Sequence, residues 1–419
     1  MAAGLLLLAV TAWTAHRLDG SWAAPGSIFA LSWFLYALLA TAFVIDPAPH
    51  GLAALWIAAG SVAVVVGGWS LPRVPSVGRP RPSLTLAQFP LLRFVTLLLV
   101  LAGVVEILYL FTRAGFSPTR IISFVVIAQL SAQNRAQFGY GDMEQGIAER
   151  VLLLCLYSGP LFGGLLFRVG GHRRDRVLGL VALINVVFVA TLYGSRMGVL
   201  FGGSFWLSSY LAATVWGGRI GTVAGRRLLF RLGILGAIVL FGLSLLAMIV
   251  RYAETSSAGR PIMLLVSDPF GFIAAFGIWL QEEGLRTQQF LGGYRTFVRF
   301  FQFFGVPAEW PPEIDVGFNR SNIYTVFRGL IEDFGTVGAM VWLGGFGAIA
   351  RLAFRGVIAG RRWAMPILVG VYAFILIGFS FSMFAYTIPS VAYALFVVYA
   401  FVAARLEDYR TRLTVRHAS

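Results

Sequence analysis

Apolar runs about as long as a membrane-crossing helix recur along nearly the whole chain. A helix needs about 20 such residues to cross the hydrocarbon core of a bilayer. The candidate spans are approximately Ala2–Ala15, Gly26–Ile45, Leu52–Leu71, Leu91–Phe111, Ile147–Phe167, Val177–Tyr193, Met197–Trp216, Leu232–Val250, Thr325–Ala350, Ala364–Ala385 and Ile388–Ala404. The pattern predicts an all-α fold, a polytopic transmembrane helix bundle of about eleven spans (range about 10–12) that forms a single membrane domain over residues 1–419.

Composition agrees with a bilayer as the solvent of this chain. The hydrophobic share is 58% and the charged share only 12%, whereas soluble domains carry roughly 25% charged residues. The first run, Ala2–Ala15, is short and lacks a positively charged start, so it is not a convincing signal peptide. It is interpreted as a span or a partial span.

The basic residues are all arginines and give the chain a net charge of +15. A charge of this size can indicate a nucleic-acid partner, but membrane proteins also concentrate basic residues in cytoplasmic loops. The arginine clusters are Arg73, Arg79 and Arg81; Arg168, Arg173, Arg174 and Arg176; Arg219, Arg226, Arg227 and Arg231; Arg351, Arg355, Arg361 and Arg362; and Arg405, Arg410, Arg412 and Arg416. They fall on alternate loops, so we predict one cytoplasmic side, an inside C-terminus and no nucleic-acid partner.

Two longer loops lie on the opposite, outer side in this topology, over residues 112–146 and 251–324. Very long loops are exempt from the positive-inside rule, so the arginines of the second loop need another explanation. The stretch Leu264–Glu283 predicts a short helix capped by Ser267 or Asp268. It is too short to cross, which suits a helix that lies in the interface or re-enters the membrane.

A second amphipathic helix is predicted over Gly292–Gly305, between bracketing glycines. Arg295, Arg299 and Gln302 stand at i, i+4 and i+7, hence on one helical face, and aromatic residues occupy the other faces. Two interpretations remain open. The arginines snorkel from an interfacial helix, or they form a clamp for an anion.

The chain from Val306 to Gly338 leads into the ninth span and carries further polar residues. Asn319 or Asn322 is predicted to cap the helix that follows. Along that helix Arg328 and Glu332 stand at i and i+4, a spacing that favours an ion pair. Polar groups at the mouth of a span are costly to desolvate, which favours a function for this region.

Polar residues elsewhere on the predicted outer half are weaker candidates. Arg196 lies in the turn "YGSRMG", where it is either a ligand contact or a membrane anchor. Arg135 lies in a stretch rich in amides that suits sugar hydroxyls and an ordinary wet loop nearly equally. Glu106 lies inside the fourth span and is either functional or paired with an arginine of another helix.

Several site types find no support in the sequence. The chain has one cysteine, Cys155, and four scattered histidines without metal-ligand spacing. A phosphate-binding loop of Walker type and a Ser/His/Asp arrangement are both missing from the pattern. We therefore expect neither a metal site nor a cofactor.

Three segments together resemble the bacterial O-antigen polymerases, the Wzy-type oligosaccharide repeat unit polymerases. These are "YGSRMG" at Tyr193–Gly198, "GGYRTF" at Gly292–Phe297 and, most strongly, "NIYTVFRGLIEDFGTVG" at Asn322–Gly338. The large outer loop before the last three spans is also similar to that family's layout. About two-fifths of the chain carries the resemblance, and the rest is generic apolar helix.

The resemblance implies a multi-pass enzyme of the bacterial cytoplasmic membrane whose active face points outward. Its implied reaction is metal-independent glycosyl transfer between undecaprenyl-diphosphate-linked oligosaccharides, within a pathway that includes a flippase and a chain-length regulator. The residues fit this chemistry, because cations stabilise a departing diphosphate and an attacking hydroxyl needs a proton acceptor. The candidate substrate-binding residues are Arg196, Arg295, Arg299, Arg320, Arg328, Arg135, Asn322 and Tyr324. The candidate catalytic carboxylates are Asp333, Glu332, Glu282 and Glu283, among which the sequence does not choose.

Two other functions stay open at this point. A polysaccharide ligase would use the same lipid-linked donor with a different acceptor. A lipid-sugar flippase or transporter would instead favour internal repeats and polar residues near mid-membrane, whereas the charges here gather in one outer loop.

Overall fold

The computed structural model describes most of the chain. Its described residues are 1–43, 50–70, 89–121, 123–139, 146–217, 271–284, 290–298, 301, 304–306, 314–315, 320–321, 325–380 and 382–418. The predicted span Leu232–Val250 and the helix start at Ser267 or Asp268 lie outside these ranges. Elements are described below within this part of the chain.

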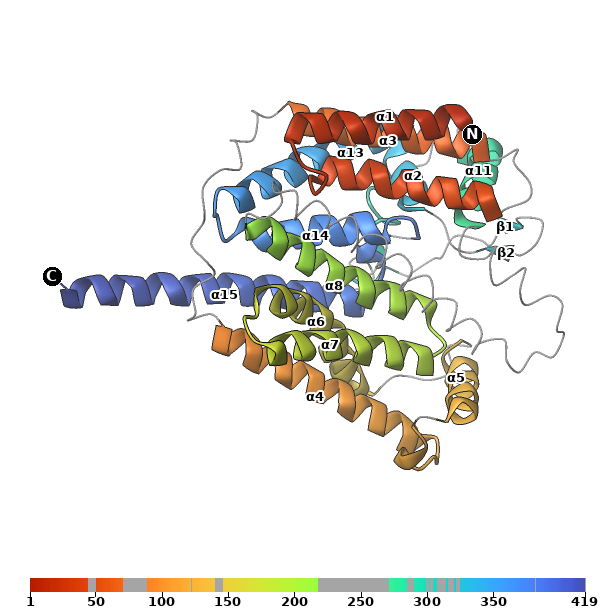
Figure 1. Ribbon diagram of the computed structural model, residues 1–419. Helices are drawn as coiled ribbons and strands as arrows, with labels where there is room; N and C mark the ends of the chain where they lie inside the picture. Colours follow the sequence, from red (N-terminus) through yellow and green to blue (C-terminus); the bar gives the residue numbers. More distant parts are fainter. Residues whose placement is uncertain are drawn as a thin grey trace.

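Long helices make up the body of the molecule (Figure 1). They are α1 (Ala2–Asp19), α2 (Pro25–Phe43), α3 (His50–Trp69), α4 (Phe89–Arg113), α6 (Ile147–Val169), α7 (Arg173–Leu192), α8 (Arg196–Trp216), α13 (Val326–Ile358), α14 (Ala364–Ile377) and α15 (Thr387–Ala418). Among the described residues, seven helices are long and apolar enough to cross a membrane, and α2 and α14 contain shorter apolar helices. The prediction of an all-α membrane bundle is confirmed in this form, and the number of spans stays a prediction.

Short elements connect or cover the long helices. They are η1 (Pro118–Arg120), α5 (Phe124–Gly139), α11 (Gly271–Trp279), η3 (Leu280–Gly284), β1 (Ile314–Asp315), β2 (Arg320–Ser321) and η4 (Met383–Ala385). The strands β1 and β2 pair antiparallel, with Ile314 opposite Ser321. The short helix predicted near Leu264–Glu283 corresponds to α11 and η3.

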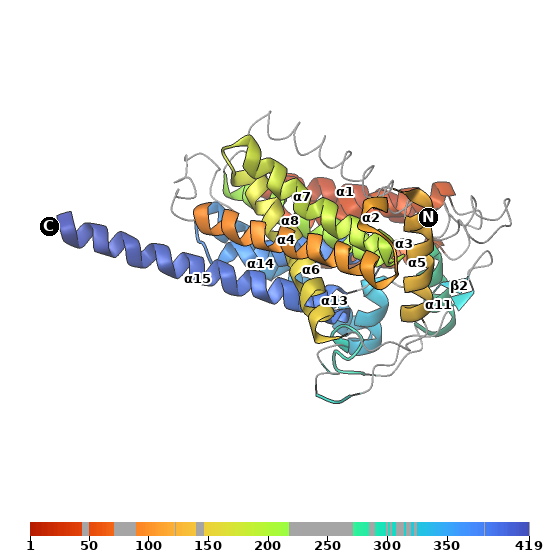
Figure 2. The same ribbon diagram turned by 90° about the horizontal axis from the view of Figure 1, so that it is seen from below.

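The long helices run side by side between two ends of the bundle, from left to right in the figures (Figures 1 and 2). At one end, Arg351 of α13 pairs with Asp19 of α1 at 2.9 Å; we call this the arginine-rich end. At the other, which we call the loop end, Arg113 of α4 pairs with Glu149 of α6 at 3.3 Å. The elements α5, α11, β1 and β2 and the N-terminus lie at the loop end, and α15 projects past the arginine-rich end.

The pairing of α13 with α3 is the closest helix contact described here. A Cβ at Gly347 would overlap the carbonyl of Val64, and a Cβ at Gly67 would overlap the carbonyl of Gly344. Small residues let helix backbones approach in this way inside a membrane, where van der Waals packing drives association. Helix α13 is therefore fixed against α3 along its membrane part.

Aromatic packing fixes the start of α13 at the loop end. Phe327 is fully buried, and its ring lies 4.8 Å from that of Trp33, 5.3 Å from that of Trp56 and 6.1 Å from that of Phe276. These rings come from α2, α3 and α11. Buried aromatic groups contribute large apolar areas and specific ring geometries, so the residues that follow Phe327 have a defined position.

Candidate functional site

Helix α13 breaks at Gly335, and the break creates the site. Gly335 has φ 68° and ψ 173° inside an otherwise helical run, a conformation that glycine adopts at little cost. The first segment therefore ends near Phe334, and a second segment continues to Ile358. The sequence predicted one uninterrupted span here. The predicted caps, Asn319 or Asn322, are wrong, because the N-cap is Thr325, immediately before the helix that packs on α2 and α3.

A segment far upstream docks on the end of the first α13 segment. The amides of Leu291 and Gly292 donate to the carbonyls of Glu332 and Asp333 at 3.3 and 3.1 Å. Gly292 and Gly293 have φ values of 62° and 95°, so a tight turn at this point needs glycine. The last carbonyls of a helix lack intrahelical donors. The docked segment supplies two backbone N–H donors to such carbonyls.

Asp333 anchors the same segment through its side chain. Its Oδ1 accepts from the Arg295 amide at 2.7 Å, and its Oδ2 accepts from the Thr296 amide at 2.6 Å. The carboxylate is fully buried. Charged hydrogen bonds to backbone amides are short and strong, so Asp333 fixes the backbone from which the Arg295 side chain extends.

Glu332 holds two arginines at once. Its Oε2 lies 3.0 Å from Nε of Arg295, and its Oε1 accepts from Nε of Arg328 at 2.6 Å. The predicted i, i+4 pair of Arg328 and Glu332 is confirmed. Arg328 is 3% exposed, and its guanidinium lies 5.1 Å from the ring centre of Trp279 at the end of α11, within the range of a cation–π interaction.

We call Arg295, Arg328, Glu332 and Asp333 the arginine–carboxylate cluster. Their formal charges sum to zero, since two guanidinium groups face two carboxylates. Attraction of an anion by these four residues would therefore depend on N–H donors held in a fixed orientation rather than on net charge. Burial strengthens such directional interactions, because the surroundings of the donors polarise less than water does.

The remaining predicted site residues are distributed as follows. Glu282 and Glu283 are exposed on η3, beside the start of the cluster's helix. Arg299, Asn322 and Tyr324 lie outside the described residues, as do the side chains of Arg135, Arg196 and Arg320. Turns occupy residues 292–297, and the predicted helical face of Arg295, Arg299 and Gln302 falls partly outside the described chain.

A second polar group lies at the loop end between α4, α6 and α7. The hydroxyl of Tyr193 lies 2.9 Å from Oε1 of Glu106 and 2.8 Å from Oε1 of Glu149. Arg113 lies 3.3 Å from Oε2 of Glu149. We call these residues the tyrosine–glutamate group. Glu106 of α4 thus contacts the tyrosine at the end of α7, and Arg113 of α4 pairs with Glu149 of α6.

The tyrosine–glutamate group shares one phenol between two carboxyl groups. A phenol has one hydrogen to donate, and its oxygen lies within hydrogen-bond distance of a carboxyl oxygen of Glu106 and of Glu149. Glu106 is fully buried, so the hydroxyl of Tyr193 is a polar partner for a carboxyl group that water does not reach.

The sequence interpretation named Glu106 and the segment of Tyr193 but missed their connection. Glu149 and Arg113 occur at the end of a span and in a loop, where charged residues are ordinary. Trp279 was likewise missed as the ring under Arg328. A signal existed for Arg113 and Glu149, since a carboxylate and an arginine at the same end of neighbouring spans are candidates for pairing. Which spans are neighbours, however, follows only from the fold.

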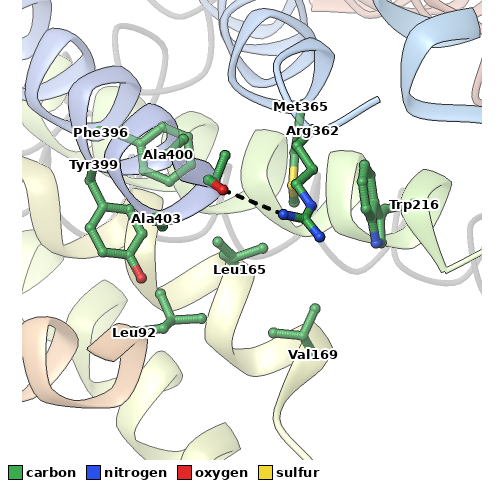
Figure 3. Close-up of a pocket in the computed structure, with 11 residues that line it drawn as sticks. Leu92, Leu165, Val169, Trp216, Arg362, Met365, Phe396, Tyr399, Ala400 and Ala403 are labelled. Atoms are coloured by element: carbon green, nitrogen blue, oxygen red, sulfur yellow. Dashed lines mark hydrogen bonds between the residues drawn. The ribbon is translucent and has the colours of Figure 1, made fainter. Parts of the chain in front are cut away.

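A small pocket of about 60 Å³ lies at the arginine-rich end between α4, α6, α8, α14 and α15 (Figure 3). Its lining is mainly apolar. Arg362 lies at its side and donates to the carbonyl of Ala404 at 3.4 Å. The pocket is at the opposite end of the bundle from both polar groups, and it takes no part in the candidate site.

Other arrangements were sought among the described residues and in known proteins. In this part of the chain, His, Cys, Asp and Glu side chains do not gather in groups of three that could hold a metal ion. Comparison of the sequence and fold with protein families, characterised proteins and solved structures finds no match. What this site can do chemically follows from its own side chains and from the resemblance that its segments carry.

Proposed function

We propose that this protein is a membrane glycosyltransferase that joins undecaprenyl-diphosphate-linked oligosaccharide repeat units. The observation that carries the proposal is the buried arginine–carboxylate cluster at the loop end of the bundle. It is built from two of the three segments that resemble the O-antigen polymerases, Gly292–Phe297 and Asn322–Gly338. In the proposal the loop end faces outward from the bacterial cytoplasmic membrane, and the arginine-rich end faces the cytoplasm.

The proposed reaction transfers the growing glycan from one lipid to another. The bond between the anomeric carbon of the donor glycan and its diphosphate oxygen breaks. A new bond forms between that carbon and a sugar hydroxyl of the next lipid-linked unit. The hydroxyl proton passes to a carboxylate, and undecaprenyl diphosphate leaves as the anion. Guanidinium donors that are oriented before the reaction stabilise this departing charge in a partly dry site.

The geometry supports a division of roles within the proposal. Arg295 and Arg328 bind the diphosphate, and Glu332 keeps both guanidinium groups oriented. Asp333 is a positioning residue, because both of its oxygens accept backbone amides. The exposed Glu282 and Glu283 then are the carboxylates best placed to accept a proton from a sugar hydroxyl that arrives from outside. Arg196, Arg299, Arg320, Arg135, Asn322 and Tyr324 remain candidate contacts to the diphosphate or the glycan.

The experiment compares single variants in an assay with purified protein in nanodiscs and a lipid-linked repeat unit. Wild-type protein lengthens the glycan on its lipid into a ladder. In Arg295→Ala and Arg328→Ala the rate falls by about 100- to 1,000-fold, the usual loss when one donor to a developing anion is removed. Arg120→Gln is the matched control, because Arg120 is an exposed arginine of η1 at the same end.

Three results would contradict the proposal. Ladders of wild-type length in both alanine variants would remove the cluster from the reaction. Transfer of the glycan to a different acceptor, without lengthening, would identify a ligase. Movement of the lipid-linked unit across the bilayer without new glycosidic bonds would identify a flippase or transporter.

A further inference from the structure

A cavity of about 570 Å³ opens at the loop end between α6, α7, α8 and α15. It lies in the size range of small-molecule sites, about 300–1,000 Å³. The lining residues are Arg150, Leu153, Tyr157, Val189, Ala190, Tyr193, Ser195, Met197, Gly198, Phe201, Tyr386, Thr387, Ile388 and Pro389. The lining therefore includes most of the turn Tyr193–Gly198, the third segment that resembles the O-antigen polymerases.

The lining combines an apolar wall with hydroxyl groups and one cation. Leu153, Val189 and Phe201 contribute the apolar part, and they are buried. Tyrosine offers a ring face together with a hydroxyl, a combination that suits sugars. Arg150 is exposed at the cavity, where a guanidinium favours phosphate oxygens. These groups match an amphipathic ligand that carries both sugar and phosphate.

The tyrosine–glutamate group contributes Tyr193 to the wall of this cavity. Tyr193 lines the cavity and is held from behind by Glu106 and Glu149. Charged and polar groups inside a membrane bundle are costly and tend to serve a site. Here they hold one tyrosine hydroxyl in place at the wall, which a purely apolar lipid contact does not require.

The connection from α14 to α15 contacts both the docked segment and the cavity. The ring of Phe384 lies 5.4 Å from that of Phe297 in the docked segment. Two residues later, the ring of Tyr386 lies 5.1 Å from that of Phe201, and both of these residues line the cavity. The cavity and the docked segment that carries Arg295 therefore lie on the same connection of the fold.

Exposed apolar residues lie next to lining residues of the cavity along the chain. Val151 on α6 and Val391 on α15 are 51% and 40% exposed, although they are apolar. A ligand whose head lies in the cavity could keep a long apolar tail along these two helices. Arg150 is adjacent to Val151 near the start of α6, so a phosphate between head and tail could contact it.

We propose that this cavity binds the sugar-diphosphate end of a second polyprenyl-linked saccharide, next to the one held by the arginine–carboxylate cluster. The inference rests on the proposed function, since joining two lipid-linked units requires both to be bound at once. The sugar of the second unit lies against Tyr157 and Tyr193, its diphosphate against Arg150, and its tail between the exposed faces of α6 and α15.

The test counts bound copies of one probe, undecaprenyl diphosphate carrying a short saccharide, on the full-length protein in nanodiscs by native mass spectrometry. Wild-type protein binds two copies at saturation. Ile388→Trp fills the cavity from its partly exposed mouth and reduces the number to one. Val341→Trp is the matched control, because Val341 is 71% exposed on α13, a helix that lines neither the cavity nor the path of the tail, and this variant retains two copies.

A second variant tests the same site without adding bulk. Arg150→Gln weakens binding of the second copy by about 10-fold or more, the loss expected for a charge-assisted contact to phosphate. Arg120→Gln leaves both copies unchanged. Because Arg150 is exposed, its replacement leaves the packing of α6 in place.

The outcomes separate this inference from the proposed function. Two copies bound to both Ile388→Trp and Arg150→Gln would overturn the cavity assignment. Displacement of the second copy by phosphatidylglycerol as readily as by the unlabelled probe would overturn it too, in favour of ordinary bilayer lipid. A wild-type protein that binds two copies but never lengthens a glycan would contradict the polymerase and leave the cavity assignment standing.

Discussion

Glu332 holds the arginine–carboxylate cluster together, because its single carboxylate pairs with two guanidinium groups from different segments of the chain. Arg328 reaches it along the same helix, and Arg295 reaches it from the docked segment. Removing one partner of a buried ion pair is usually more costly than the pair is stabilising. The effects of changes at these three positions should therefore not add.

Replacing Arg328 by lysine tests whether shape matters beyond charge. A guanidinium is planar, can stack on the ring of Trp279 and can donate to two acceptors at once, whereas an ammonium is a compact, strongly hydrated charge. We expect Arg328→Lys to lose most of the polymerisation rate, at least about 10-fold, although the formal charge is kept. The measurement is the initial rate of ladder formation. A rate equal to wild type would show that charge alone suffices.

Replacing Asp333 by asparagine tests the anchor. One oxygen becomes an NH2 group that cannot accept from a backbone amide, so one buried donor loses its partner at a cost of about 1–3 kcal/mol. We expect the amides of Arg295 and Thr296 to exchange with deuterium about 10-fold faster or more, since 1.4 kcal/mol corresponds to a factor of ten. Unchanged protection of residues 291–296, measured by mass spectrometry, would contradict the anchoring role.

At the scale of elements, the two segments of the broken helix α13 have different roles. The second segment packs on α3 through glycines. The first segment carries Arg328, Glu332 and Asp333 of the arginine–carboxylate cluster. The docked segment completes the end of the first segment with backbone donors. Gly335 itself is half-buried, and a Cβ at this position would meet nothing within 4 Å.

The glycine contact between α3 and α13 can be tested with a matched pair. A Cβ at Gly347 would overlap the Val64 carbonyl, whereas a Cβ at Gly345 meets open space. We expect Gly347→Ala to lower the midpoint of thermal unfolding in nanodiscs by several degrees, as overpacking costs about 1–3 kcal/mol. Gly345→Ala should leave it unchanged or raise it slightly, because alanine is the better helix former. Equal midpoints for the two variants would argue against close packing here.

The sequence predicted the helical class and the pair of Arg328 with Glu332, and it named Arg295 among the candidate site residues. It missed the break at Gly335, because glycines are frequent in membrane helices and most of them do not interrupt one. The amides of Arg295 and Thr296, which Asp333 accepts, lie 38 and 37 positions before it in the sequence. Local periodicity cannot predict a contact over that separation. The contact of Tyr193 with two glutamates depends on three helices whose neighbours follow from the fold alone.

At the scale of the whole molecule, the distribution of charge separates the two ends of the bundle. The arginine-rich end holds the ends of α6 and α13 and the C-terminal part of α15, and the loop end holds both polar groups. Arginines in short loops favour the cytoplasmic side. This distribution of charge predicts that the arginine-rich end faces the cytoplasm.

Cysteine labelling tests that direction. Cys155 is the chain's one cysteine, so Cys155→Ser provides a background without thiols. In that background Phe290→Cys lies at the loop end and Trp363→Cys at the arginine-rich end, at positions 72% and 43% exposed in the protein. An impermeant maleimide should label Phe290→Cys in intact cells and Trp363→Cys after permeabilisation. The reverse pattern would place the active face inside.

The docking of Leu291–Thr296 on Glu332 and Asp333 has a consequence for the order in which the protein is made. The arginine of the upstream segment leaves the ribosome before the residues that will hold it have been synthesised. Until α13 inserts, Arg295 has neither its backbone anchor nor its carboxylate. A nascent or truncated chain that ends before Glu332 therefore has no assembled site, and the chemistry becomes available only after the ninth predicted span is in the bilayer.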